Sequence, residues 1–416
     1  MANQFLTTSQ ILQRSLPVVR NELTFSKHVN TQYSDQFARE GAKVSATVNA
    51  RKPPKYRGRY GNAIDVEDIS ETPVPIVCDK LFGVDLEYDD VALTLTMDNY
   101  QERYIDPVMA RIANEVDYTG MQLFKNVYNF VGVPNAILAT GLDYLNLGVK
   151  LDNTGTPRRG KDSRVAVISS QMQATLANAQ AALFNKQQSI AEQYETGEMG
   201  FALGLQFAMD QNTAAHTIGA LGGTPVINGA NQTGASIVTD GWSNSITRVL
   251  GEGDIVTFAS VYGIVPNTAT RTGGGVSTGA LQQFVITADV DSDGSGNATI
   301  SIDPPIITTG AFQTVTASPA DNAVILIFGH ASTYAGLSIK NGMIFHKNAF
   351  TRVMVDLPVP GGVDMGGRIR DKASGLAFRL VRAYDVRGNS RPTRVEALWG
   401  WSTLYPEWAA RAISSS

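Results

Sequence analysis

Residues 222–329 differ in composition from the rest of the chain, and this contrast limits how the chain can be organised. The stretch contains eight acidic side chains, two arginines and no lysine, a net charge of −6. Short alternating segments recur between clusters of Gly, Asp, Asn and Thr, at 254–258, 282–288, 297–303 and 323–328. Alternation interrupted by turn residues is typical of strands. We therefore expect an all-β module, and because mixed composition resumes after Gly336, we expect it to be inserted into another domain.

Chain length and charge set further limits. The 416 residues predict two or three domains, since single cores stop growing at roughly 250–300 residues. Charged residues make up only 17%, against a usual ~25%, and large buried contact surfaces would explain this deficit. Residues 1–60 and 340–395 each carry a net charge of +7, in contrast to the acidic module. This charge asymmetry fits electrostatic steering between protein surfaces, or a protein surface that lies close to nucleic acid.

The cysteine content and the hydropathy pattern indicate the cellular environment in which the chain folds. Cys78 is the only cysteine, which excludes an intrachain disulfide and favours a reducing environment. Residues 1–20 lack the apolar centre of a signal peptide. The longest apolar run, 323–328, is far shorter than the ~20 residues of a transmembrane helix. We expect a soluble chain, or one assembled from soluble subunits, without a membrane segment.

Residues 44–95 have the pattern of a long extended loop. Apolar residues alternate with polar ones from Val44 to Ala50, which predicts a strand, and Pro53 and Pro54 then prevent further ladder hydrogen bonds. Five basic residues gather at the expected tip: Arg51, Lys52, Lys55, Arg57 and Arg59. We interpret the tip as a contact with a neighbouring subunit. Binding of nucleic acid, with Tyr56 stacking on a base, is the alternative.

A long helix is predicted to follow. Asp106 suits an N-cap and Pro107 suits the first helical position, where no hydrogen bond is lost. Apolar residues keep helical spacing from Val108 to Val131, and Gly132 then ends the pattern. A buried strand is expected to begin at residue 164, and a second helix to cover about 171–195.

Two short motifs resemble ligand sites without completing them. Residues 155–162 (GTPRRGKD) lack the Ser or Thr that a phosphate-binding P-loop needs after Lys161. The second motif, Asp289, Asp291, Asp293 and Gly294, matches the first half of a calcium loop, but Ile300 replaces the bidentate Glu. We expect these four residues to form a hairpin tip between 284–288 and 298–302, with adventitious calcium binding as the alternative.

The remaining residues give no catalytic signal. The four histidines are scattered without metal-ligand spacing, and no nucleophile-elbow sequence is present. His216 is expected to be a packed histidine at a turn. We predict a protein that is not an enzyme and has no catalytic, cofactor-binding or metal-binding residues.

The order of several sequence blocks resembles the major capsid proteins of tailed phages, especially the P-22-type coat proteins. A basic, proline-bearing loop follows an alternating strand. The further blocks are 84–88 (VDLEY), 93–107 (LTLTMDNYQERYIDP), 113–117 (ANEVD), 193–204 (QYETGEMGFALG), 210–212 (DQN), 216–219 (HTIG) and 369–385 (IRDKASGLAFRLVRAYD). The resemblance covers nearly the whole chain, and it depends on the order of motifs that are individually weak.

This resemblance implies an α+β chain with the HK-97-like capsid fold and an inserted Ig-like or barrel domain. The axial domain would combine about 135–221 with 330–395. The implied division is an N-terminal arm at 1–43, an extended E-loop with adjoining strands at 44–97, a peripheral-domain spine helix at 98–134, a first axial and peripheral segment at 135–221, the inserted domain at 222–329 and a second segment at 330–416.

The resemblance also implies function and partners. The chain would assemble with itself into hexamers and pentamers of an icosahedral virion capsid, made in the cytoplasm of a bacterial host. A scaffolding protein, a portal protein, packaged double-stranded DNA and a decoration protein are the implied partners, and no membrane is involved. Two alternatives remain: a nanocompartment shell protein of the same fold, and a secreted calcium-binding hydrolase or adhesin.

Overall fold

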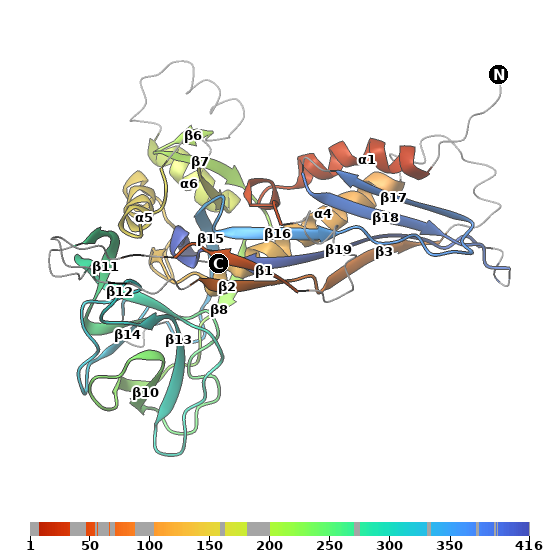
Figure 1. Ribbon diagram of the computed structural model, residues 1–416. Helices are drawn as coiled ribbons and strands as arrows, with labels where there is room; N and C mark the ends of the chain where they lie inside the picture. Colours follow the sequence, from red (N-terminus) through yellow and green to blue (C-terminus); the bar gives the residue numbers. More distant parts are fainter. Residues whose placement is uncertain are drawn as a thin grey trace. The chain divides into compact units, whose positions relative to one another are not determined.

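The computed structural model describes residues 8–33, 47–54, 56, 66, 71–87, 104–158, 163–180, 200–269, 275–330, 334–371, 374–386, 388 and 390–415. The chain forms two compact units, each built from three separate segments (Figure 1). The first unit contains Met1–Arg51, Pro73–Gly120 and Phe350–Leu404, and the second contains Lys52–Thr72, Met121–Ala349 and Tyr405–Ser416. Both units combine helices and strands, so the chain belongs to the α+β class.

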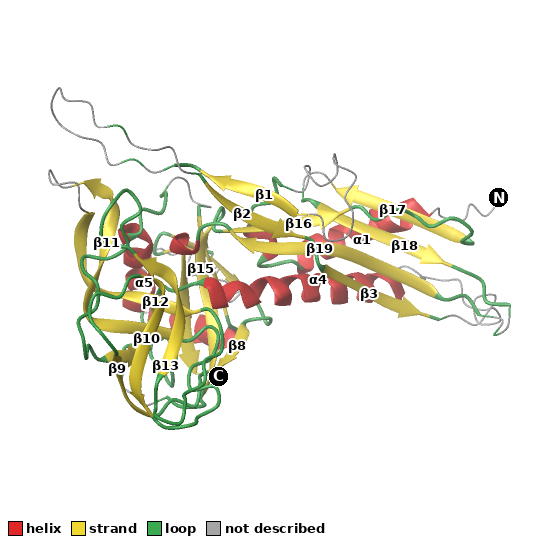
Figure 2. Cartoon of the chain, turned by 60° about the horizontal axis from the view of Figure 1, so that its bottom comes forward, coloured by secondary structure: helices red, strands yellow, loops and turns green. Residues whose placement is uncertain are grey.

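The first unit is an antiparallel sheet packed on one helix. The strand order is β16 (Phe350–Val355), β19 (Thr393–Thr403), β18 (Leu376–Arg382) and β17 (Met365–Asp371), and β3 (Lys80–Leu86) also pairs with β19. Helix α4 (Asp106–Met121) runs along this sheet (Figure 2). Its apolar residues at four-residue spacing, Val108, Ile112 and Val116, are buried against side chains such as Trp399. Helix α1 (Thr8–Glu22) packs on β17, and the short helix η1 (Ser26–His28) follows it.

Helix α4 begins at Asp106, as expected, but the prediction that it continues to Val131 is wrong. The α-helix ends at Met121 and becomes the 3-10 helix η3 (Gln122–Asn126). The chain then extends into β4 (Phe130–Val131), which pairs with β20 (Ala409–Ser415). The apolar spacing continues beyond Met121 because these residues are also buried, but a distant strand supplies their hydrogen bonds.

The second unit contains a seven-stranded sheet. Its path is β4, β20, β15 (Ser338–His346), β5 (Arg164–Ile168), β7 (Leu205–Met209) and β6 (Phe201–Ala202), and β8 (Ala214–Thr217) also pairs with β15. Helices α5 (Gly141–Asn153) and α6 (Ser170–Gln180) share a core with this sheet. The expected strand at 164 and the start of the second helix are present. The remainder of that predicted helix, 181–195, lies outside the described residues.

The acidic module forms a six-stranded antiparallel β-structure within the second unit. Its order is β14 (Ile325–Ile327), β11 (Ile255–Ala269), β12 (Gly275–Ile286), β13 (Ala298–Ile306), β10 (Gly234–Trp242) and β9 (Gly223–Ile227). The four expected segments are strands, whereas β9 and β10 were not predicted. A bridge between Val226 and Val324 and a hydrogen bond of 3.0 Å from Ile227 N to Ala323 O connect β9 to the chain before β14. The strand order therefore closes on itself as a barrel.

The late part of the chain is divided between the two units, and this corrects the expectation that 330–395 belongs with 135–221. Only β15 and β20 join the seven-stranded sheet, whereas Phe350–Leu404 lies in the first unit. The reason is pairing: β19 takes β3, β16 and β18 as neighbours, and its apolar side chains cover α4. Among the helices of the described ranges, none is long and apolar enough to cross a membrane.

Candidate functional site

Strands β1 (Thr47–Lys52) and β2 (Thr72–Val77) form a separate two-stranded sheet, here named the β1–β2 ribbon. Each strand buries a single side chain, Ala50 in β1 and Ile76 in β2. An isolated two-stranded sheet is at best marginally stable in water. Within the described part of the chain no third strand pairs with the ribbon, and Ser402 of β19 donates to Pro75 O at 3.1 Å, so the stability of the ribbon depends on contacts beyond its own ladder.

The predicted basic tip lies at the end of β1. Arg51 is exposed, and Lys52 is half-buried with its ammonium 5.2 Å from the ring centre of Tyr405. Tyr405 in turn stacks on Trp408 at 4.1 Å. Lys52 therefore has a cation–π contact within its own chain. Lys55, Arg57 and Arg59 lie outside the described residues, so the intersubunit role of the tip stays a prediction.

Helix α4 contains the predicted helix start and, further along, a buried carboxylate that holds another segment of the chain. Asp106 and Pro107 occupy the first two positions of α4. One carboxylate of α4, Asp117, is buried and accepts hydrogen bonds from backbone N–H groups after α1: Thr24 at 2.6 Å, Phe25 at 3.2 Å and Ser26 at 2.9 Å. Asp117 therefore fixes the segment after α1 to the first unit's central helix.

The acidic tip residues lie between β12 and β13, where the two strands pair at Ile286–Ile302. Asp289 and Asp291 accept hydrogen bonds from the 248–252 segment, and Asp293 accepts within its own turn. Asp289 accepts from Glu252 N at 2.7 Å, Asp291 accepts from Arg248 N at 2.6 Å, and Asp293 accepts from Asn297 N at 2.8 Å. The hydrogen bond from Glu252 N lowers the pKa of Asp289, and hydrogen bonds from the side chain and the backbone of Asn297 lower the pKa of Asp293.

Each of these carboxylates is already engaged by backbone N–H groups, those of Asp289 and Asp291 in the 248–252 segment and that of Asp293 in its own turn. Gly294 completes the turn without contributing a side chain. Within the described ranges, no group of three His, Cys, Asp or Glu residues could hold a metal ion.

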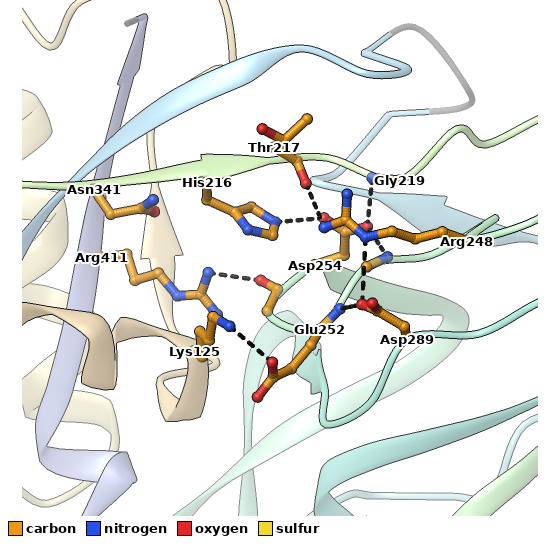
Figure 3. Close-up of polar contacts among 12 residues, drawn as sticks. Lys125, His216, Thr217, Gly219, Arg248, Glu252, Asp254, Asp289, Asn341 and Arg411 are labelled. Atoms are coloured by element: carbon orange, nitrogen blue, oxygen red, sulfur yellow. Dashed lines mark hydrogen bonds and ion pairs between the residues drawn. The ribbon is translucent and has the colours of Figure 1, made fainter. Parts of the chain in front are cut away.

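A buried polar cluster joins the barrel to the surrounding strands of the second unit; we name it the junction cluster, consisting of His216, Asp254, Asn341 and Arg411 (Figure 3). His216 comes from β8, and Asp254 directly precedes the barrel strand β11. Nε2 of His216 lies 2.7 Å from Oδ1 of Asp254. A carboxylate only accepts hydrogen bonds, so Nε2 of His216 carries the hydrogen and is the donor of this hydrogen bond. Oδ2 of Asp254 accepts from two backbone groups, Gly251 N at 2.7 Å and Gly219 N at 3.0 Å.

Arg411 connects the other side of the junction cluster. Its Nε donates to Val127 O at 2.6 Å and its Nη1 donates to Gly253 O at 2.7 Å, beside Asp254. The guanidinium also lies 5.3 Å from the ring centre of Phe124. Burial lowers the pKa of Arg411 to about 9, and the charge of Asp254 opposes this shift, so the side chain stays charged at neutral pH. A planar guanidinium suits this role because it reaches two carbonyls at once.

Contacts at the rim of the junction are more exposed. Lys125 pairs with Glu252 at 2.8 Å, and Arg248 donates from Nη2 to Thr217 O at 3.0 Å (Figure 3). The buried centre therefore carries more of the stability than the rim, since exposed ion pairs contribute about 0–1 kcal/mol. His216 is packed as expected, although in a strand and not at a turn. Sequence reasoning did not identify Asp254 or Arg411, because these polar residues belong to no local motif.

Comparison with known proteins gives no match to a family model and none to a curated protein. The structure is similar to solved chains from phages and their capsids. A chain of Mycobacterium phage Che8 is 12% identical, with 94% of this chain and 90% of that chain covered and a TM-score of 0.44. The capsid of cyanophage P-SCSP1u is 10% identical, with 95% and 89% covered and a TM-score of 0.43. The mature capsid of bacteriophage PhiM1 is 9% identical, with 99% and 89% covered and a TM-score of 0.42. TM-scores below 0.5 do not by themselves establish a shared fold.

Proposed function

We propose that the chain is the major capsid protein of a tailed double-stranded DNA phage and that its role is structural. The observation that carries the proposal is the β1–β2 ribbon, which buries one side chain in each strand and pairs with no third strand among the described residues. A strand edge is completed by pairing with another chain. Such a ribbon suits a protein whose folded subunit is finished only on assembly.

The charge pattern supports the same proposal. The ribbon carries basic Arg51 and Lys52 at its end, and the barrel belongs to a stretch with a net charge of −6. Opposite charges on separate surfaces of one chain favour head-to-tail contacts between copies. Contacts of that kind close into rings when the rotation between copies is suitable, which is how hexamers and pentamers form.

The sequence resemblance adds the finer expectations. The HK-97-like fold would make the β1–β2 ribbon part of the E-loop, α4 the spine helix, and the barrel the inserted domain. A scaffolding protein, a portal protein, a decoration protein and packaged DNA would be the partners. The location would be the virion capsid, after synthesis in the host cytoplasm.

The ribbon supplies the test. Deletion of residues 51–60 is expected to abolish shell formation, measured by electron microscopy, while the subunit keeps its thermal unfolding transition, measured by circular dichroism.

A second variant replaces Arg51, Arg57 and Arg59 together by Ala. Its control combines Lys80→Ala, Arg158→Ala and Lys347→Ala, which lie outside the ribbon. Fewer shells only for the ribbon variant would support a contact at the tip. Normal shells from the deletion variant would contradict the proposal for the ribbon.

The contents of the particles distinguish a phage capsid from a nanocompartment shell. Nuclease-resistant DNA in particles recovered from infected cells supports the phage capsid. A co-purifying enzyme in place of DNA would point to a nanocompartment instead.

A further inference from the structure

Helix α5 is apolar on two opposite sides, and the described residues of the chain cover only one of them. Its start is defined by a capping box in which Thr140 and Asp143 exchange hydrogen bonds. One side of the helix, formed by Tyr144, Leu147 and Leu151, is fully buried in the core beneath the seven-stranded sheet. A surface helix normally has one apolar stripe facing the core and polar residues on the opposite face.

The other side of α5 carries an apolar stripe, defined here as Leu142, Leu145 and Val149. These side chains are 65%, 44% and 52% exposed. Their spacing of three and four residues places them on one face, opposite Tyr144, Leu147 and Leu151. No described residue of the chain covers this stripe.

A glycine beside the stripe gives a second observation. Gly148 lies inside the helix, three residues after Leu145, and a Cβ added there would meet nothing within 4 Å. Glycine in a helix interior destabilises the helix relative to alanine, and the described chain provides no close contact that requires it. A neighbour that approaches the helix backbone closely would require it.

Charges of both signs lie around the stripe. Asp143 and Asp152 lie on α5 near the stripe, and Asp152 is already paired with Arg164 at 2.7 Å and Arg158 at 3.7 Å. Lys150 also lies on α5, so the charges form no basic patch that would favour phosphate, and an apolar stripe with a mixed polar rim suits a protein contact.

The size of the stripe indicates what kind of protein covers it. Three partly exposed side chains offer far less than the roughly 800 Å² per partner of a stable independent complex. The occupant must therefore be held by other contacts as well. A second copy of this chain meets that condition, because among the described residues no third strand pairs with the β1–β2 ribbon of the same chain.

We propose that the α5 stripe is covered by a second copy of this chain in the assembled ring. This inference rests on the proposed function, since it requires shells or rings to form. Closure of a ring repeats the small contact once per subunit, so a weak patch becomes an effective determinant of assembly.

The first test compares two valines of similar exposure in the second unit. Val149→Gln lies in the stripe, whereas Val238→Gln lies on barrel strand β10, where Val238 is 42% exposed. Both variants should keep the unfolding midpoint of the wild-type subunit, because both positions are on the surface. The protein concentration needed for shell formation, measured by sedimentation, should rise about tenfold for Val149→Gln and stay unchanged for Val238→Gln. Equal behaviour of the two variants would overturn the proposal.

A second measurement keeps the test decisive if Val149→Gln changes folding. An environment-sensitive fluorophore on Leu145→Cys should move to a less polar environment when subunits assemble, and the native Cys78 is buried and does not compete for the label. A probe that stays in water within intact shells would overturn the α5 contact while leaving the capsid proposal intact. Absence of shells from wild-type protein would instead contradict the proposed function itself.

Discussion

Nε2 of His216 lies 2.7 Å from Oδ1 of Asp254, and both side chains are buried. The pair connects β8 of the seven-stranded sheet to the residue that precedes barrel strand β11. The hydrophobic core also connects the barrel to the neighbouring strands, because Ile218, Ile339 and Ile413 cluster with barrel residues. The acidic module is therefore inserted in sequence but shares its core and its buried polar contacts with the rest of the second unit.

The first prediction concerns the buried carboxylate of that pair. Asp254→Ala should lower the free energy of unfolding by about 3–5 kcal/mol, because two backbone donors and Nε2 of His216 lose a buried acceptor. Urea unfolding of unassembled subunits measures the change. Glu252→Ala is the matched control, since its pair with Lys125 is partly exposed and should contribute less than about 1 kcal/mol. Equal effects of the two substitutions would show that the junction cluster is not a stabilising centre.

A second prediction concerns the segment after α1. Asp117→Ala should release this segment from α4, because three backbone N–H groups at residues 24–26 lose their acceptor. Amide hydrogen exchange at these residues should accelerate, whereas exchange in β19 should remain slow. Asp106→Ala, at the first position of the same helix, serves as the control. Unchanged protection of residues 24–26 would contradict this role for Asp117.

A third prediction uses a glycine in β19. A Cβ added at Gly400 would lie 1.9 Å from the carbonyl oxygen of Val77, at the end of β2. Gly400→Ala should therefore displace the end of the β1–β2 ribbon and lower the melting temperature of the subunit by several degrees. Gly361→Ala, where the added Cβ meets nothing within 4 Å, should have little effect. Two melting curves that coincide would refute the close approach of β2 to β19.

A fourth prediction follows from the single cysteine. Burial raises the pKa of the Cys78 thiol from 9.0 to about 12, and the charge of Asp79 adds to this effect. Above about pH 9 the unfolded chain loses the thiol proton while the folded chain keeps it. The unfolded state then binds fewer protons, so the contribution of this group makes folding less favourable as pH rises.

The same shift predicts reactivity, because the thiolate is the nucleophile. Alkylation by iodoacetamide at pH 8 should be slow in the native protein and fast in urea. Cys78→Ala should abolish labelling and weaken the decline in stability at alkaline pH. Rapid labelling of the native subunit would mean that Cys78 is accessible.

Local signals predicted local features. Asp106 and Pro107 predicted the start of α4 to within one residue, because a first-turn proline acts through its own residue; Asp106 is the first helical residue and not the N-cap, and its buried Oδ1 has no hydrogen-bond partner among the described residues. The end of α4 could not be predicted from spacing, since the pairing of β4 with β20 joins residues near 130 and 411. Strands β9 and β10 were missed because Pro225 and Gly241 interrupt the alternation that reveals a strand.

The junction cluster could not be predicted either. His216 and Asp254 are 38 residues apart, and Arg411 is 158 residues from Gly253. Nothing near these residues in the sequence distinguishes a buried pair from surface charges. Only the topology brings β8, the start of β11 and β20 together.

Electron microscopy of the purified full-length chain tests the central claim most directly. The protein would be concentrated across a range of ionic strengths, alone and together with a co-expressed scaffolding candidate. The account predicts closed, hollow shells built from hexameric and pentameric rings. A chain that stays a folded monomer under every one of these conditions would contradict it.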